Sequence, residues 1–372
     1  PEARTAPDRP WSEVLAEVPG ASVLPPWEQA VERTLPRLLV IDATAIGSRS
    51  ATGQIKDLFL RGWPRERLLQ VLDTPEGPRI KAFEPGVAPP AGSLDEVVAA
   101  CEAFDPQVIY LRPTDAMPMF AVFQALQRRA RRPLVLHMMD DWPERSRVEA
   151  PTGFPALDSA LRTTIADAQA CLSISRAMSA AYRERYGAHF IPLANGVDAE
   201  AVPTHDHDAR GPVTRERPFV VRYMGGLARD MTFDSVIDVA RAVSTLSTRL
   251  PVRMEICTMP WYRDEAAAAL GSLPGVSLHD LVDAERYPAL LADADALVIA
   301  YNFDERTRRY VGLSLANKLP ECLASGAPLL AYGPDTIATI DELSAAVCAF
   351  VVTRRDGAAL EACILAWLES RV

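Results

Sequence analysis

Two charged side chains that could do phosphate and sugar chemistry lie near the start of one short expected helix. Lys318 stands at the beginning of this helix, and Glu321 follows one turn inside it. The first N–H groups of a helix lack intrahelical partners and attract anions, and a lysine adds a full positive charge. A carboxylate does not bind a phosphate, so Glu321 would need a different partner. In dinucleotide-binding folds, an acidic residue accepts hydrogen bonds from the ribose hydroxyl groups. The pair fits a nucleotide site, although an ordinary amphipathic helix start contains the same two residues.

The residues around this pair predict a loop, a short helix and a strand. Asn317 is a favourable N-cap, and Pro320 falls in the first turn, where a missing N–H costs nothing. Gly326 suits the left-handed position after a helix, and Pro328 prevents the helix from continuing. The apolar residues 329–331 then predict a short strand.

The whole segment resembles the donor-binding signature of retaining family-4 glycosyltransferases, which have the GT-B fold. In one subgroup this signature reads Ser-x-x-x-Lys-x-x-Glu-x-x-x-x-Gly-x-Pro, and here it runs from Ser314 to Pro328. The resemblance implies that Glu321 holds the ribose of the nucleotide and that Lys318 is catalytic. The loop before Lys318 would hold the diphosphate and the sugar, through Ser314, Leu315 and Asn317.

The commoner form of this signature has an earlier Glu followed by a Phe-Gly pair. The corresponding residues 310–314 read Tyr-Val-Gly-Leu-Ser, so the carboxylate that would contact the sugar is missing. Asp304 or Glu305, in the loop that follows Tyr301, could replace it. A solvated loop of mixed charge explains the same residues. Tyr301 itself is assigned to substrate binding.

A second resemblance joins two segments before the expected domain junction. Ile174-Ser-Arg-Ala-Met178 is followed by Pro192-Leu-Ala-Asn-Gly-Val-Asp198. Family-4 proteins commonly have a Ser at the first place and Pro-x-x-Asn-Gly-Val-Asp at the second. Asn195-Gly196 is also a turn signal in its own right, so the order and spacing of the two segments carry the resemblance.

Polar residues follow the buried strand expected at residues 134–138. Ligands of parallel sheets lie at the carboxyl ends of the strands, where His137, Asp140 and Asp141 stand. The resemblance implies that His137 is catalytic and that Asp140 binds substrate. A core histidine, a helix-capping Asp and a solvated Asp would explain the same residues. GT-B enzymes generally need no metal at the donor site, and no metal is expected.

The glycine-rich loop at residues 224–230 is the expected diphosphate loop of the second domain. Family-4 proteins often have Gly-Arg-Leu here and a Lys a few residues later. This chain has Gly226 and Met231 near those places, and Arg229 is the only basic residue of the loop. The resemblance assigns a catalytic role to Arg229 and substrate binding to Gly225. A surface position for Arg229 fits about equally well.

Two further loops are assigned to substrate by their positions. Gly53 ends a stretch of small residues between an expected strand and helix, where a ligand could approach the backbone closely. An ordinary strand-to-helix turn that binds no ligand would have the same sequence. His279 begins the segment that the resemblance places near the nucleobase.

Strands alternate with helices along nearly the whole chain, which predicts parallel sheets covered by helices. The fold class is therefore α/β, and the resemblance specifies GT-B, with two Rossmann-like domains whose parallel sheets face a cleft. Expected strands are residues 38–42, 68–72, 108–111, 134–138, 171–174, 190–193, 219–223, 252–257, 276–279, 296–299 and 329–331. Expected helices are residues 54–61, 94–103, 117–129, 156–168, 175–186, 233–246, 263–270, 284–291 and 358–368.

A chain of 372 residues exceeds the size of one hydrophobic core, which stops growing near about 250–300 residues. We expect an N-terminal extension at 1–35, an acceptor domain at 36–198 and a linker at 199–217. The donor domain then covers 218–372 and ends in a helix. The linker contains His205-Asp-His-Asp208, which could chelate a metal, but solvated charge in a loose linker is favoured.

Composition limits the class of protein further. A net charge of −10 argues against nucleic-acid binding. The six cysteines show no C-x-x-C pair and fit buried thiols in a reducing cytoplasm. No apolar run reaches the ~20 residues of a spanning helix. Basic residues at 58–67 and 128–132 predict weak peripheral contact with the inner face of a membrane, or equally a solvated surface.

The resulting hypothesis is a metal-independent, retaining glycosyltransferase of the hexosyltransferase type. It would use a UDP- or GDP-linked sugar and a hydroxyl acceptor, glycan or lipid-linked, in surface polysaccharide or glycoconjugate synthesis. It would need no cofactor besides this co-substrate. Two alternatives stay open: a nucleotide-sugar 2-epimerase on the same fold, and a non-catalytic nucleotide-sugar-binding scaffold.

Overall fold

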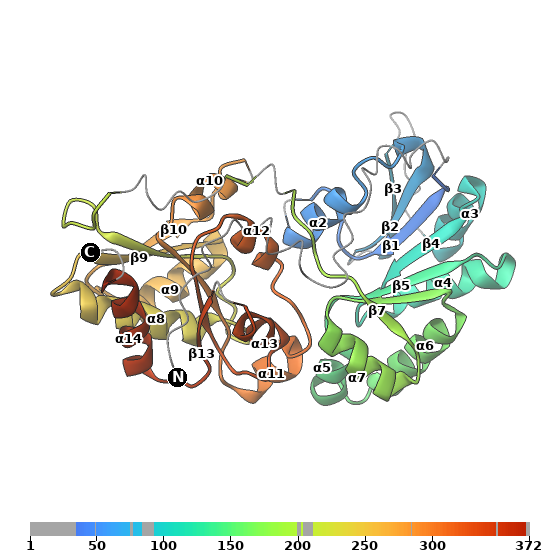
Figure 1. The fold of residues 1–372 in the computed structure, drawn as a ribbon. Coiled ribbons are helices and arrows are strands. Elements are labelled where there is room, and N and C mark those ends of the chain that lie inside the picture. Colours follow the sequence, from blue (N-terminus) through green and yellow to red (C-terminus); the bar gives the residue numbers. More distant parts are fainter. Residues whose placement is uncertain are drawn as a thin grey trace.

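The chain folds into two α/β domains, each built around its own sheet (Figure 1). The structure is a computed structural model. It describes residues 35–48, 50–74, 77–83, 93–198, 202–203, 211–283, 285–346 and 349–369. The expected N-terminal extension, except residue 35, lies outside this part. So do residues 199–201 and 204–210 of the expected linker, including its His-Asp-His-Asp segment.

The first sheet has seven strands in the order β3-β2-β1-β4-β5-β6-β7. All neighbours pair in parallel except β2 and β3, which are antiparallel. The strand order turns back between β1 and β4, the point where ligands of such sheets bind. The strands are β1 Leu38–Asp42, β2 Leu68–Thr74, β3 Gly77–Ala82, β4 Val108–Arg112, β5 Leu134–Met138, β6 Ala170–Ser173 and β7 Phe190–Pro192.

Several first-domain helices begin at side-chain caps that the sequence provides. Ser93 and Glu96 form a capping box at α3, and Ser175 caps α7. Gly187 ends α7 with a φ of +69°, a conformation that favours glycine. The helices are α2 Ala51–Phe59, the 3-10 turn η2 Arg65–Arg67, α3 Leu94–Phe104, α4 Met117–Arg129, α5 Trp142–Glu149, α6 Phe154–Asp167 and α7 Arg176–Tyr186.

The second sheet has six parallel strands in the order β10-β9-β8-β11-β12-β13. Its order also turns back, here between β8 and β11. The strands are β8 Phe219–Met224, β9 Val252–Thr258, β10 Val276–Asp280, β11 Ala296–Ala300, β12 Leu329–Tyr332 and β13 Ala349–Val352. The two sheets confirm the predicted fold class.

The second-domain helices lie on both sides of this sheet, and α14 packs along α8. In Figure 1, α11 and α12 lie on the side of the second domain that faces the first. The helices are α8 Phe233–Ser247, the 3-10 turn η5 Pro260–Tyr262, α9 Arg263–Leu270, α10 Tyr287–Ala292, α11 Glu305–Val311, α12 Leu319–Ala324, α13 Ala338–Ser344 and α14 Gly357–Glu369.

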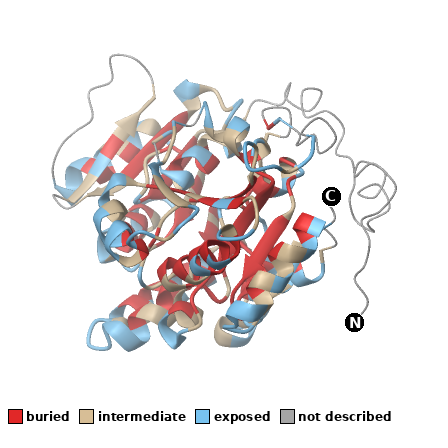
Figure 2. Ribbon diagram, turned by 90° about the vertical axis from the view of Figure 1, so that its left-hand side faces the viewer, coloured by how far each residue is buried: buried red, intermediate tan, exposed pale blue. Residues whose placement is uncertain are grey.

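Each domain buries its own apolar core around its sheet, as the buried strands in Figure 2 show. Every residue of β1, β8 and β11 is buried. The second sheet has separate core clusters on its two faces, because successive strand residues point to opposite sides. Continuous apolar runs in the sequence therefore correctly indicated strands covered on both faces.

Several local predictions were wrong. Gly53 lies inside α2, which begins at Ala51 with Ser50 as its cap, and not in a loop. Asn317 is not the N-cap of α12, because Lys318 occupies that position. The loop expected after Tyr301 contains α11, whose cap is Asp304. Helix α5 and strand β3 were not predicted, since short polar segments lack a clear hydrophobic period.

Candidate functional site

The loop of residues 314–318 lies against the first domain. Ser314 Oγ donates a hydrogen bond to the carbonyl oxygen of Met139, at 3.3 Å, just past the end of β5. One residue earlier, the carbonyl oxygen of Leu313 accepts a 2.5 Å hydrogen bond from Ser175 Oγ, the cap of α7. The loop therefore connects the second domain to the carboxyl ends of β5 and β6.

A side-chain pair joins the two segments that sequence resemblance singled out. Asn195 Nδ2 donates a 2.7 Å hydrogen bond to Asn317 Oδ1, across 122 residues of sequence. Asn195 is buried, and Asn317 is exposed. The Asn-Gly-Val-Asp segment at the end of the first domain thus contacts the loop of the second.

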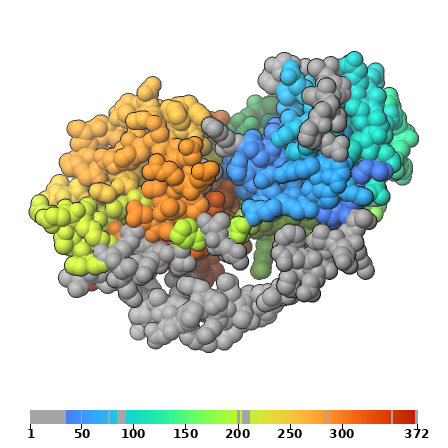
Figure 3. Space-filling view, turned by 90° about the horizontal axis from the view of Figure 1, so that it is seen from above, coloured from blue at the N-terminus to red at the C-terminus, as the bar shows by residue number. Residues whose placement is uncertain are grey.

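Packing and charge extend this contact between the domains. Leu315 packs against the apolar core of the first domain. Arg306 on α11 pairs with Glu149 on α5 at 2.9 Å, and Arg145 lies over the ring of Tyr310 at 4.6 Å. In the space-filling view the two domains lie side by side and meet along one boundary (Figure 3).

Lys318 is held at the carboxyl end of β8. Its Nζ donates a 3.0 Å hydrogen bond to the carbonyl oxygen of Met224 and lies 3.8 Å from the ring centroid of Tyr223. A Cβ on Gly225, whose φ is +149°, would lie 3.4 Å from this Nζ. Burial lowers the pKa of Lys318 to about 8. The structure brings Lys318 and Gly225 together, and a larger side chain at Gly225 would crowd the ammonium group.

Glu321 lies in the first turn of α12, and its side chain is partly buried. Burial raises the pKa of its carboxyl above the usual value. Within the described residues its carboxylate has neither a hydrogen-bond nor an ion-pair partner. A partly buried acceptor of this kind suits the hydroxyl groups of a ligand.

Arg229 makes local contacts. Its guanidinium pairs with Glu265 at 2.5 Å and lies 4.2 Å from the ring centroid of Phe233. The side chain is 60% exposed. Among the described residues, no contact joins Arg229 to Lys318.

His137 is fully buried on β5. Its Nδ1 lies 2.7 Å from the hydroxyl of Tyr110, which is on the neighbouring strand β4. Burial, together with the positive charges of Arg112 and Lys56, lowers the pKa of His137 to about 4. The imidazole is therefore neutral near pH 7, and a direct catalytic role would need a ligand that reaches a fully buried ring.

Sequence reasoning missed a group of buried charges beside His137. Asp42 accepts two hydrogen bonds from Arg112, at 2.8 and 2.9 Å, and also pairs with Lys56 of α2. The available signal was the charged residue that ends an apolar strand, since Asp42 ends β1 and Arg112 ends β4.

Asp140 lies beside this group, two residues after the end of β5. Its Oδ2 is 3.6 Å from Arg112 Nη1, and 44% of its side chain is exposed. Burial raises the pKa of Asp140, while Arg112, Arg145 and Lys56 oppose this rise. Burial raises the pKa of Tyr301 and of Tyr310, both in the second domain, and the negative charge of Asp140 adds to this rise.

The structure also shows the local contacts of three other predicted residues, Tyr301, Gly53 and His279. Tyr301 is buried, and its hydroxyl is 3.3 Å from Thr339 Oγ1. A Cβ on Gly53 would lie 2.1 Å from Ser48 Oγ, so this glycine allows α2 to pack on the preceding loop. His279 is exposed, with Nε2 at 2.8 Å from Ser277 Oγ.

The described part of the chain was also compared with what a metal site or a membrane span requires. There, no group of three or more His, Cys, Asp or Glu side chains could hold a metal ion. The helices described in this structure include none that is long and apolar enough to cross a membrane. In the basic segment 128–132, Arg129 pairs with Glu102 and Arg132 with Asp105, each at 2.7 Å.

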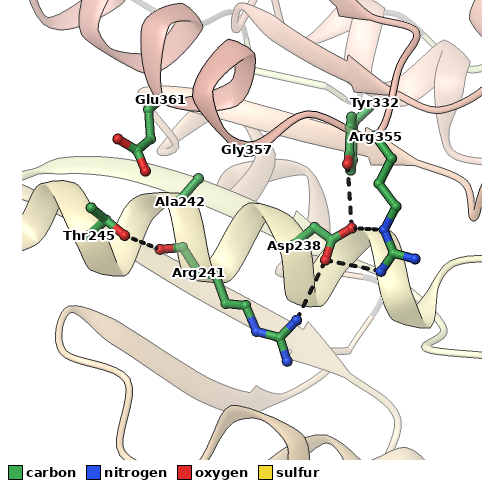
Figure 4. Close-up of a pocket in the computed structure, with 8 residues that line it drawn as sticks. All are labelled: Asp238, Arg241, Ala242, Thr245, Tyr332, Arg355, Gly357 and Glu361. Carbon is green, nitrogen blue, oxygen red and sulfur yellow. Dashed lines mark hydrogen bonds and ion pairs between the residues drawn. The ribbon is translucent and has the colours of Figure 1, made fainter.

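A pocket of about 220 Å³ lies elsewhere in the second domain, lined by residues of α8, β12 and α14 (Figure 4). Asp238 at its wall pairs with Arg355 at 2.7 Å and with Arg241 at 3.6 Å. Its charges largely neutralise one another, so the pocket offers no net charge to a ligand.

Comparison with known proteins gives the fold. No family model matches the sequence, and no curated protein matches it. Among solved structures, sucrose-phosphate synthase from Thermosynechococcus elongatus aligns with a TM-score of 0.59 at 14% identity, over 90% of each chain. A glycosyltransferase from Rickettsia africae aligns with a TM-score of 0.57 at 10% identity, over 89% of this chain and 88% of the other.

A third neighbour is a point mutant of TarM from S. aureus, in complex with fondaparinux, α-GlcNAc-glycerol and UDP. It aligns with a TM-score of 0.56 at 12% identity, over 78% of this chain and 55% of the other. At such identities the likeness establishes the fold, which is GT-B with two Rossmann-like domains. The chemistry must be argued from the site.

Proposed function

We propose that this chain is a glycosyltransferase that moves a sugar from a nucleoside-diphosphate sugar to a hydroxyl acceptor. One observation carries the proposal: Lys318 lies beside Gly225 at the carboxyl end of β8, with the carboxylate of Glu321 one turn into α12. This arrangement offers a cation for a diphosphate and an acceptor for ribose hydroxyls at the edge of the sheet where such ligands bind. The glycosyltransferases among the fold neighbours support the proposal.

The chemistry requires stabilisation of the departing diphosphate. Lys318 provides a positive charge where negative charge develops, and its hydrogen bond to the carbonyl oxygen of Met224 fixes the position of its ammonium group. No metal is needed if this charge suffices, so we propose a metal-independent hexosyltransferase. Retention at the anomeric carbon rests on the resemblance of residues 314–328 to the family-4 signature.

The donor is proposed to carry UDP or GDP, and a fold neighbour in complex with UDP makes UDP the first to test. The acceptor is proposed to be a glycan or a lipid-linked hydroxyl, in surface polysaccharide or glycoconjugate synthesis at the cytoplasmic side of a membrane. The acceptor would approach from the first domain, where Met139 accepts a hydrogen bond from Ser314 in the loop of the second.

A thermal-shift screen with UDP, GDP, TDP and ADP tests the nucleotide. Ligand at about 100 times its dissociation constant stabilises a protein by about 2.7 kcal/mol, so the preferred base should stand out. The matching sugar nucleotides are then incubated with hydroxyl acceptors, with and without EDTA. Absence of a shift with every nucleotide would contradict the proposal, and loss of turnover in EDTA, restored by a divalent ion, would contradict its metal-independent form.

A non-catalytic sugar-nucleotide-binding protein is the second candidate, because Arg229 is engaged by Glu265 and Phe233. A site that uses Lys318 alone could bind a diphosphate without releasing it efficiently. Nucleotide binding without turnover on any acceptor would favour this candidate. Conversion of the sugar nucleotide into its epimer without any acceptor would indicate an isomerase.

A further inference from the structure

The two faces of the first sheet are covered unequally over strands β4 to β7. On one face, residues such as Leu111, Leu136 and Phe190 are buried in a single apolar core with helices α3 to α7. Successive strand residues point to opposite sides, so the residues between them face the other way. The large apolar residues of that second set form the open face, and all are half-buried or exposed: Val108, Tyr110, Val135, Leu172 and Ile191.

An apolar open face is unusual for a parallel sheet, because such sheets normally have both faces covered. Ile191 is 48% exposed, and the apolar cores of the described residues include neither Val135 nor Leu172. A cavity of about 40 Å³ is lined by Leu60, at the end of α2, and by Tyr110 of β4. The cover that α2 provides thus ends at β4, and the open face from β4 to β7 suits a further apolar element.

The described part of the chain begins beside the open face. Arg67 Nη1 donates a 2.7 Å hydrogen bond to the carbonyl oxygen of Leu35. Trp63 Nε1 donates a 3.0 Å hydrogen bond to the carbonyl oxygen of Pro36. Trp63 also packs on the same small apolar core as Val108 of the open face. Residues 1–34 therefore join the folded domain at the edge of this face.

The sequence that precedes Leu35 contains two amphipathic stretches. In residues 11–18, apolar residues recur at i, i+3, i+4 and i+7 from Trp11, the spacing of one face of a helix. In residues 27–35, an apolar residue recurs every four residues from Trp27 to Leu35. At helical spacing the opposite sides of the two stretches are polar, with Glu13, Glu17, Gln29 and Arg33. Each stretch therefore has one apolar side that could pack on a sheet.

Length and composition favour residues 1–34 over the other segments outside the described residues. Residues 84–92 contain one large apolar residue, Val87, and lead into α3 on the opposite face. Residues 204–210 are polar, and the remaining segments have three residues or fewer. Neighbouring strands are about 4.8 Å apart, so β7 lies about 19 Å from β1 across the face. Eight helical residues span about 12 Å, so two such stretches are long enough to cover it.

We propose that residues 11–35 of this chain pack their two amphipathic stretches on the open face and complete the first domain. The packing removes side chains such as Leu172 and Ile191 from water, and burial of apolar surface is the main favourable contribution to folding. The inference does not rest on the proposed function. It concerns a face of the sheet and not its carboxyl edge, and its test needs no ligand.

Thiol labelling of the full chain measures whether the open face is covered. Ile191→Cys and Val148→Cys are made separately, and peptide mass spectrometry follows the reaction of each new thiol with N-ethylmaleimide. The described residues leave Ile191 and Val148 similarly exposed, at 48% and 42%, and Val148 lies on α5, away from the open face. If residues 11–35 cover the face, the thiol at position 191 should react at least about tenfold more slowly than the thiol at position 148.

Variants of the N-terminal segment identify what covers the face. Trp11→Asp and Trp27→Asp place a charge on the apolar side of each stretch, and should restore fast labelling at position 191. Gln29→Asp is the matched control, because it places the same charge on the opposite side and should leave labelling slow. The buried thiol of Cys101 reports unfolding and should stay unreactive throughout. If it reacts in an Asp variant, the corresponding Trp→Ala variant takes its place.

Two outcomes would overturn the inference. Equal labelling rates at positions 191 and 148, with residues 11–35 unchanged, would show that the open face meets solvent. Slow labelling at position 191 that neither tryptophan variant accelerates would show that another occupant covers the face. Protection that grows with protein concentration would then identify a second copy of the chain. Protection that appears only with added anionic vesicles would identify a membrane surface.

Discussion

Asn195 of the first domain donates a 2.7 Å hydrogen bond to Asn317 of the second. Asn195 follows the last strand of its sheet, and Asn317 immediately precedes Lys318. The bond therefore lies beside the residue proposed to meet the diphosphate. Its presence indicates that the position of Lys318 depends on how the two domains meet.

The Asn195–Asn317 hydrogen bond should contribute a measurable interaction free energy to the stability of the folded chain. A double-mutant cycle with Asn195→Ala and Asn317→Ala, followed by urea unfolding, should give an interaction free energy of about 1 kcal/mol. Asn317→Ala leaves Asn195 buried without its partner, so it should cost more than expected for an exposed residue. Additive effects of the two single variants would contradict a contact between the domains in solution.

Glu321→Ala should weaken nucleotide binding at least tenfold, because it removes the proposed ribose acceptor. The free energy of unfolding should change little, since the carboxylate has no partner among the described residues. Isothermal calorimetry with UDP and GDP measures the loss. Glu342→Ala on α13 is the control, an exposed helical carboxylate outside the site. Unchanged affinity in Glu321→Ala would refute the signature interpretation.

Nucleotide affinity should fall as the pH rises above about 8. The pKa of Lys318 is lowered to about 8, so the ammonium loses its charge in this range. Lys318→Arg keeps the charge and should remove the pH dependence. Lys318→Ala should reduce turnover more than it raises the donor KM, because the charge of the leaving diphosphate grows in the transition state. An affinity that stays constant from pH 7 to 9.5 in the wild type would separate Lys318 from the diphosphate.

Folding stability should decrease as the pH falls from about 6.5 toward 4. The pKa of His137 is about 4 in the folded chain and near 6.5 when unfolded, so the unfolded chain binds more protons in this window. The effect amounts to at most about 3 kcal/mol, and His137→Phe should remove it. Urea unfolding at pH 7, 6 and 5 compares the two proteins. Parallel slopes for both would mean that His137 does not titrate in this way.

Binding to anionic vesicles should be weak and salt-sensitive. Arg129 and Arg132 are paired with acidic neighbours, so their charge is partly neutralised. A basic residue near an anionic surface contributes about 1 kcal/mol. Joint replacement of Arg128, Arg129, Arg131 and Arg132 by Glu should abolish flotation at low salt. If wild type and variant both stay unbound, this segment has no part in membrane contact.

The sequence alone determined the features that depend on local pattern. Buried strands such as Leu38–Asp42 and Ala296–Ala300 were found because a strand covered on both faces is apolar throughout. The caps at Ser175 and Gly326 follow from short-range chemistry. The alternation of strands with helices gave the fold class, and the segment Ser314–Pro328 directed attention to Lys318 and Glu321.

Only the tertiary structure decided which of these residues meet. The pairing of Asp42 with Arg112, 70 residues apart, depends on β1 and β4 being neighbours in the sheet, which no local pattern encodes. The contacts of Asp304, which caps α11, and of Arg229, which pairs with Glu265, likewise depend on the folded chain. Charge and residue type are local properties, but the partner that satisfies a charge is chosen by the packing of the whole chain.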